Sequence, residues 1–193
     1  MKNIEELRTY GDDFFVVSYK DDILIIVEKD RYDIINFSGE KDFYLFDCNL
    51  KNIGHLNFIL QHLNGKQIKE RKDNGWLDVP EYFVILNEIN IKDNYRDNHL
   101  GNFLLNYGIK DLMELSKWIN KELPITFIRI NTPVTRQFYK KWGAEYNEGR
   151  TGSKRGFSYM IIKSPKPKEE YEGKVIYKSI ICEDCKSSSL EEK

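Results

Sequence analysis

The feature that most constrains the fold of this chain is a strand, a polar loop and a helix that follow one another between residues 82 and 119. Residues 82–91 read as one long strand, whose side chains alternate between two faces from Leu86 onward. One face carries Leu86, Glu88 and Asn90, and the other carries Asn87, Ile89 and Ile91. The polar loop 92–98 leads into a helical pattern that begins near Leu100, in which Leu105, Ile109, Leu112 and Ile119 share one face. Such a junction exposes the unpaired backbone N–H groups of a helix N-terminus.

The segments before this junction predict short strands. Residues 14–19 and 23–27 are rich in β-formers and are separated by a three-residue turn, and two further strands are predicted at 42–46 and 55–60. The charged stretch 66–78 follows the turn signal Asn64-Gly65 and is predicted to be a loop.

The segments after the junction predict a second strand and a second helix. Pro124 stops the first helix, and residues 125–130 form the strand. Thr132 can cap the second helix, Pro133 suits its first position and Gly143 follows its end, so that Val134, Phe138 and Trp142 would share one face. A last strand is predicted at 156–162.

The order of these elements predicts an α/β (α+β) fold in a single domain. The domain is expected to span residues 1–163, and residues 164–193 are expected to form a linker and a C-terminal tail, with an extra edge strand over 175–181.

The composition fits a packed domain without a strong charge bias. Hydrophobic residues make up 40% of the 193 residues, and 30 Lys and Arg face 31 Asp and Glu, for a net charge of -1. This balance lacks the basic footprint of a nucleic-acid binder and favours a small-molecule or protein partner. No signal peptide is readable at the start, and apolar runs such as 23–27 are too short to cross a bilayer, so a cytoplasmic protein without membrane attachment is expected.

Neither the cysteines nor the histidines suggest a metal site. The three cysteines are too few for a disulfide framework. Cys182 and Cys185 form one CxxC without a second ligand pair, so they are interpreted as incidental thiols rather than as a zinc or redox site. His55 and His62 flank an apolar run without a matched carboxylate spacing, and are interpreted as structural.

The junction carries a motif for binding an anion. Backbone N–H groups and the partial positive charge of a helix N-terminus suit a pyrophosphate, Gly101 allows close approach of the backbone, and Arg96 adds a positive side chain. The stretch Arg96-Asp97-Asn98-His99-Leu100-Gly101 resembles the acyl-CoA loop of the GNAT superfamily, whose pattern is Arg/Gln-x-x-Gly-x-Gly/Ala. Three positions depart from it. His99 stands where the family has its first glycine, and Asp97 and Asn98 stand where the family usually has basic or glycine residues. Asp97 also brings negative charge toward an anionic ligand.

A second segment resembles a later motif of the same family. It runs from Asn131, at the end of a strand, through Phe138 and Tyr139 on a helix, to Gly143 and Ala144. The two segments lie in the family's order and cover roughly residues 80–160.

The resemblance implies a mixed, mostly antiparallel sheet with flanking helices and splayed central strands. It further implies an N-acyltransferase that moves an acetyl or other short acyl group from CoA to a primary amine, without a metal. Tyr139 would be the general acid that protonates the CoA thiolate, and Glu88 would accept the proton of the amine, although Glu88 could equally be a solvated strand residue. The cofactor-binding residues implied are Ile89, Asn90, Ile91, Arg96, Asp97, Asn98, His99, Leu100, Gly101, Asn102, Asn131 and Phe138.

The identity of the amine and the oligomeric state stay open, a homodimer included. The alternative function is a degenerate GNAT module that binds a ligand or a protein without turnover, because His99 and Asp97 could weaken the cofactor site.

Overall fold

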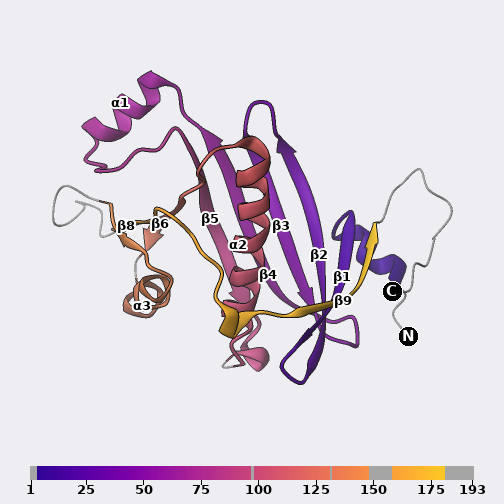
Figure 1. Cartoon of the computed structure of the whole chain (residues 1–193). Coiled ribbons are helices and arrows are strands. Elements are labelled where there is room, and N and C mark those ends of the chain that lie inside the picture. The colour runs from indigo at the N-terminus through magenta and orange to yellow at the C-terminus, as the bar shows by residue number, and fades with distance from the viewer. Residues whose placement is uncertain (1–3, 97, 131, 148–157, 181–193) are drawn as a thin grey trace.

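The computed structural model describes residues 4–96, 98–130, 132–147 and 158–180. Within these ranges the strands form one sheet of nine, in the order β7-β8-β6-β5-β4-β3-β2-β1-β9 (Figure 1). Every neighbouring pair is antiparallel except β5 and β6, which run parallel. The mixed, mostly antiparallel sheet confirms the predicted fold class.

The first half of the chain is a meander of five strands. These are β1 (Asp13–Tyr19), β2 (Asp22–Asp33), β3 (Ser38–Phe46), β4 (Asn52–His62) and β5 (Tyr82–Ile91), and a short 3-10 helix, η1 (Ile4–Thr9), precedes them. The predicted strands are confirmed, and β2, β3 and β4 are longer than expected because polar residues extend their pairing beyond the apolar runs.

The loop predicted for 66–78 is wrong in its first part, because Gly65–Asp73 forms helix α1. Asn64 and Gln67 make a reciprocal capping box at its start: the Asn64 side chain accepts from the Gln67 backbone, and the Gln67 side chain accepts from the Asn64 backbone. None of its residues is buried. The helix therefore lacks the apolar periodicity by which sequence reasoning finds helices.

The central strands splay as the family resemblance implies. β5 pairs with β6 (Ile125–Ile130) only at Val84, Ile85 and Leu86, although β5 continues to Ile91. Beyond Leu86 the described pairing of β5 is with β4 alone. The second half of β5 therefore has one edge released from the sheet.

A bulge lies at the same point of β5 and overturns the predicted alternation. Phe58 of β4 pairs with Leu86 and its neighbour Asn57 pairs with Glu88, so Asn87 is the extra residue. Leu86 therefore joins the same buried cluster as Ile91 instead of facing away from it. A strict period of two could not reveal this, because one inserted residue exchanges the faces of all that follow.

One face of the sheet is covered by helix α2 (Leu100–Ile119). Its buried side, which includes Leu104, Leu105 and Ile109, packs on Phe43 of β3 and Phe58 of β4 within the main core. Asn120 ends the helix in a left-handed conformation. In the ranges given above, no helix has the length and apolar character needed to cross a membrane.

The last elements complete the sheet. Helix α3 (Pro133–Lys141) begins at Thr132, which accepts a hydrogen bond from the Thr135 amide, as predicted. Its predicted apolar face is wrong at Val134, which is 77% exposed, whereas Tyr139 and Trp142 are buried. β7 (Glu145–Tyr146) and β8 (Ser158–Ile162) follow, and then the 3-10 turn η3 (Glu169–Tyr171) and β9 (Lys174–Ile180), which pairs with β1 as an edge strand.

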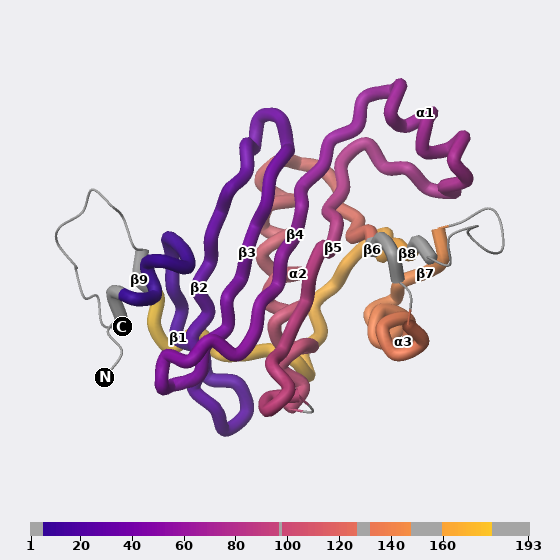
Figure 2. Tube along the Cα trace, turned by 180° about the vertical axis from the view of Figure 1, so that it is seen from behind, coloured from indigo at the N-terminus to yellow at the C-terminus, as the bar shows by residue number. Residues whose placement is uncertain are grey.

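The other face of the central strands is open. Seen from behind, β2 to β5 lie in front of α2, and none of the described helices crosses their middle (Figure 2). Small apolar clusters close the two ends of this face, one around Phe46 and Leu7 and one around Phe83 and Leu63. Polar side chains occupy the middle, between the two clusters.

Candidate active site

The loop between β5 and α2 forms a basic hollow. It contains the turn η2 (Asp93–Tyr95) and borders a cavity of about 480 Å³. Lys51, Lys92 and Arg96 line this cavity together with Asn90, Asp93, Asn94 and Tyr95. The Arg96 Nε donates a 3.1 Å hydrogen bond to the Ile91 carbonyl oxygen, and its Nη2 pairs with Asp93 at 2.9 Å. Three cations around the loop that precedes α2 provide the charge that an anionic ligand requires.

His99 is the N-cap of α2 and adopts a left-handed backbone conformation, with φ of 59°. A residue with a Cβ pays a free-energy cost in this conformation, and glycine does not. His99 occupies the position at which the family has its first glycine, and its backbone has the conformation that a glycine adopts most easily. The His99 side chain makes no capping hydrogen bond and is exposed, so the first N–H groups of α2 have no cap from it.

The start of α2 suits a diphosphate. The first intrahelical bond runs from the Phe103 amide to the His99 carbonyl, which leaves the amides of Leu100, Gly101 and Asn102 outside the helical ladder. A Cβ added at Gly101 would meet Ile91 Cγ1 at 3.7 Å, an ordinary contact. Packing within the chain therefore does not require a glycine at this position. A ligand that approached the backbone closely would require one.

Tyr139 is buried on α3, and α3 is fixed to the start of α2. The Trp142 Nε1 donates a 3.2 Å hydrogen bond to Asn102 Oδ1 in the first turn of α2. Tyr139 is 7% exposed in the main core, and burial raises its pKa to about 12. Its phenol therefore holds its proton throughout the physiological pH range.

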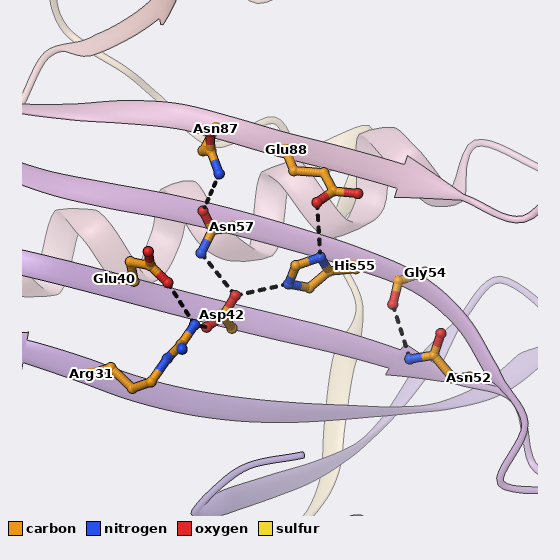
Figure 3. A network of polar contacts seen from close by, with 9 residues as sticks. All are labelled: Arg31, Glu40, Asp42, Asn52, Gly54, His55, Asn57, Asn87 and Glu88. Atoms are coloured by element: carbon orange, nitrogen blue, oxygen red, sulfur yellow. Dashed lines mark hydrogen bonds and ion pairs between the residues drawn. The ribbon is translucent and has the colours of Figure 1, made fainter.

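The half of β5 beyond the bulge carries the other predicted residues. Ile89 and Ile91 pack toward the core beneath α2. Glu88, whose side chain is 50% exposed, lies on the open face with its Oε2 3.6 Å from His55 Nδ1 (Figure 3). Asn90 is exposed and lines the basic hollow.

The other predicted residues differ in position. Leu100 is buried, Phe138 is half-buried beside Tyr139, and Asn98 is exposed. Asp97 and Asn131 lie outside the described residues, as do Cys182 and Cys185.

Sequence reasoning missed several residues around this site. Lys51 reaches it from the turn between β3 and β4, and no local pattern marks it. Tyr171 of η3 lies with its ring centroid 5.7 Å from that of Trp142 and 6.2 Å from that of His99. The segment that holds Tyr171 is tied to α2, because the buried Asn106 donates to the Tyr171 carbonyl and accepts from the Lys168 amide.

Comparisons with known proteins give structural relatives only. A scan against protein-family models found no match, and a search of curated proteins found none. The crystal structure of a bacterial toxin aligns over 73% of this chain and 90% of its own, with 13% identity and a TM-score of 0.52. A mutant of the toxin AtaT, bound to the C-terminus of the antitoxin AtaR, aligns over 72% of this chain and 90% of its own, with 12% identity and a TM-score of 0.48.

A GNAT-family acetyltransferase from Staphylococcus aureus aligns over 66% of this chain and 71% of its own, with 15% identity and a TM-score of 0.42. At such identities a likeness concerns the fold alone, and only the first of the three comparisons has a TM-score above 0.5. The parallel pair β5–β6 that splays beyond Leu86, with α2 between its strands in sequence, is the architecture that the two sequence motifs predict. The chain therefore shares its fold with the bacterial toxin structure, and that fold has the arrangement that the GNAT resemblance implies.

Proposed function

We propose that this chain is an acyl-CoA-dependent N-acyltransferase, with acetyl-CoA as the donor and a primary amine as the acceptor. The observation that carries the proposal is the end of β5–β6 pairing at Leu86, in a strand whose far end, Ile91, lies beside the start of α2. The side chain of the N-cap residue His99 does not cap that helix start. The released edge of β5 offers backbone groups to an extended ligand arm, and the helix start offers amides to a diphosphate. A ligand that joins the two groups, as acyl-CoA does, fits this arrangement.

The basic hollow supports the same ligand. Lys51, Lys92 and Arg96 place positive charge around the loop that joins β5 to α2, and Asp93 offsets part of it. The thioester end would lie along β5, where a backbone N–H of the Glu88–Ile91 stretch could stabilise the developing oxyanion. Holding donor and amine side by side supplies proximity.

Tyr139 stabilises the departing thiolate in this proposal. With its pKa at about 12, the phenol is always protonated at neutral pH, but it lies about 3.5 units above a reference thiol. Full transfer to a free thiolate would therefore be uphill by about 5 kcal/mol. Tyr139 therefore acts best by donating a hydrogen bond to the sulfur while the C–S bond breaks. This hydrogen bond strengthens as negative charge develops on the sulfur.

Thermal unfolding with acetyl-CoA tests the proposal. Ligand at 100 times its Kd should raise the free energy of unfolding by about 2.7 kcal/mol. S-acetylpantetheine, which lacks the diphosphate, is the matched control and should give a much smaller shift at equal concentration. The proposal fails if millimolar acetyl-CoA leaves the melting temperature unchanged.

A second candidate function is a GNAT-fold binding module without turnover. The side chain of His99 at a position that favours glycine is the observation in its favour, because a side chain at that position would crowd a bound diphosphate. The two functions differ in a single assay. A module that binds acetyl-CoA gives the thermal shift but releases no free thiol in the presence of amines, whereas the enzyme gives both.

A further inference from the structure

The open face of the sheet carries a polar cluster centred on His55. We call Asp42, His55 and Glu88 the Asp42–His55–Glu88 cluster; they come from β3, β4 and β5 (Figure 3). The His55 Nε2 lies 2.8 Å from Asp42 Oδ1, and its Nδ1 lies 3.6 Å from Glu88 Oε2. The His55 ring stacks on Tyr44 with centroids 4.6 Å apart. Stacking and the Asp42 contact together hold the imidazole in one orientation.

Asp42 is an ionised carboxylate with a full set of donors. Burial alone would raise its pKa, but hydrogen bonds from His55, Arg31 and Asn57 outweigh burial and lower the pKa to about 2. Arg31 Nη2 donates at 2.6 Å and Asn57 Nδ2 donates at 2.8 Å. An ionised carboxylate can only accept, so the His55 Nε2 must be the nitrogen that carries the proton. Whenever the ring is neutral, its lone pair is then on Nδ1.

In the neutral form of His55, the Nδ1 lone pair and the Glu88 carboxylate face each other as two acceptors. Their separation of 3.6 Å is too long for a direct hydrogen bond. A group that carries N–H donors and positive charge would satisfy both acceptors at once. A protonated primary amine has this chemistry.

The cluster lies at the point where the sheet opens. Glu88 directly follows the bulge residue Asn87. The Asn87 Nδ2 donates a 2.9 Å hydrogen bond to Asn57 Oδ1. The pairing of β5 with β6 ends at Leu86, one residue before the bulge. Strand alternation places His55 on the open face and its neighbour Leu56 in the core beneath α2, the core that also contains Tyr139. His55 and Tyr139 are thus on opposite sides of the sheet, with the released edge of β5 between them.

We propose that His55 is the catalytic base, that it takes the proton of a cationic primary amine which binds against Glu88 on the open face, and that Asp42 is its positioning residue. The proposal rests on the acyltransferase function and deepens it by assigning the acceptor side. One proton passes from the ammonium nitrogen to His55 Nδ1, which leaves a neutral amine. The amine nitrogen bonds to the acyl carbon and the C–S bond breaks, while Tyr139 donates a hydrogen bond to the departing sulfur. The nitrogen loses its second proton to solvent, and the thiolate takes up one proton from solvent. The products are an amide, the CoA thiol and a protonated His55, which returns its proton to solvent.

His62 provides a matched control on the same strand. Its Nε2 lies 3.2 Å from a carboxylate oxygen of Glu81, and its ring stacks on Tyr82 with centroids 4.5 Å apart, so its contacts resemble those of His55. His62 lies far from the released edge of β5, because it pairs with Tyr82 at the start of that strand. A purely structural role would make the two histidines alike.

The experiment measures CoA release from acetyl-CoA with n-butylamine as the acceptor, alongside the acetyl-CoA thermal shift. His55→Gln should lower kcat/KM at least 100-fold and keep the thermal shift, and His62→Gln should change kcat/KM less than threefold. Added imidazole should restore part of the activity of His55→Ala. His55→Gln within threefold of the wild type would overturn the role of His55.

The pH profile separates a base from a structural residue. His55 faces Asp42 and Tyr44 from β3 and Glu88 from β5, with Arg31 and Glu40 beyond Asp42. The wild-type kcat/KM should rise with pH through one ionisation to a plateau. Asp42→Asn should shift that rise to lower pH, because the imidazolium loses its partner charge, and should lower the plateau. An unshifted rise in Asp42→Asn would overturn the role of Asp42.

The acyltransferase function and the amine site on the open face are contradicted by different results. No acetyl-CoA shift in the wild type contradicts the acyltransferase proposal itself. A normal shift without CoA release from n-butylamine contradicts the amine site on the open face.

Discussion

The indole Nε1 of Trp142 donates a hydrogen bond to Asn102 Oδ1 and so joins the end of α3 to the first turn of α2. Trp142 comes three residues after Tyr139, and Asn102 comes one residue after Gly101, so this contact connects the proposed acid with the proposed diphosphate site. The Trp142 ring also lies beneath the Lys168 ammonium, 5.1 Å from the ring centroid. The position of Tyr139 relative to the start of α2 depends on this contact.

Trp142→Phe should therefore affect both stability and binding. The ring stays apolar, but Asn102 loses its donor, and the free energy of unfolding should fall by about 1–2 kcal/mol, measured by urea denaturation. Acetyl-CoA affinity should fall as well, because the first turn of α2 loses a restraint. Trp118→Phe is the control: Trp118 is 70% exposed near the far end of α2, and its replacement should leave both quantities nearly unchanged.

His99→Gly should stabilise the protein. The left-handed backbone at φ 59° costs a histidine about 1–2 kcal/mol, which glycine would avoid. Glycine also gives the unfolded chain more conformational freedom, which destabilises the folded state by about 0.5–1 kcal/mol. We expect a net increase of about 0.5–1 kcal/mol in urea unfolding, together with tighter acetyl-CoA binding. Asn120→Gly at the other end of α2, φ 51°, should gain less, because asparagine tolerates this conformation. A loss of stability in His99→Gly would mean that the imidazole makes a favourable contact that outweighs its backbone cost.

Tyr139→Phe should slow transfer by about 100-fold while acetyl-CoA affinity changes little, since the ring still fills the core. Because burial raises the pKa of Tyr139 to about 12, the wild-type rate should show no loss from tyrosine ionisation below about pH 10. Tyr146→Phe is the control, since Tyr146 is 47% exposed on β7, beyond the end of α3. A wild-type rate in Tyr139→Phe would remove this residue from the chemistry.

Glu28 should make stability depend on pH. It lies beneath α2, accepts a 2.8 Å hydrogen bond from the Tyr107 hydroxyl, and has its pKa raised to about 7 by burial, with a further contribution from Asp111. A group whose folded pKa is raised stabilises the fold below its unfolded pKa, near 4.5, and that contribution is lost as pH rises through 7. The wild type should lose about 2–3 kcal/mol between pH 5 and pH 8 on this account.

Glu28→Gln stays neutral and should not show this loss, so its advantage over the wild type should grow with pH in urea titrations. The exposed Glu114 of α2 is the control, because the free energy of unfolding of Glu114→Gln should depend on pH as that of the wild type does. Parallel curves for Glu28→Gln and the wild type would show that Glu28 titrates normally in the folded protein.

Local signals predicted a large part of the fold. Residues 82–91 and 125–130 were predicted as strands with their observed bounds, since apolar and β-branched side chains run through both and Pro124 marks a boundary. Helix α3 was predicted at its observed start because Thr132 and Pro133 are strong N-terminal signals. The residues of the capping box, Asn64 and Gln67, are also visible in the sequence. They do not predict α1 on their own, because a helix without buried residues has no apolar periodicity to accompany the cap.

The acceptor side of the candidate site depends on contacts between distant residues. His55 was interpreted as structural, because its carboxylate partner Asp42 is 13 positions earlier and meets it only through the register of β3 and β4. The bulge at Asn87 was equally hidden, since a polar residue beside Glu88 fits a regular exposed face as well as an insertion. In contrast, the motif around His99 and Gly101 is contiguous, and the sequence was enough to place it at a helix start.

Amide hydrogen exchange with and without acetyl-CoA tests the central claim most directly. The account predicts slower exchange of the backbone amides at residues 99–103 and in the second half of β5, 87–91, where the ligand would meet the helix start and the released edge. The capping region of α1 should not change and serves as the internal reference. Protection that falls elsewhere, or none at saturating acetyl-CoA, would contradict the acyl-transfer account.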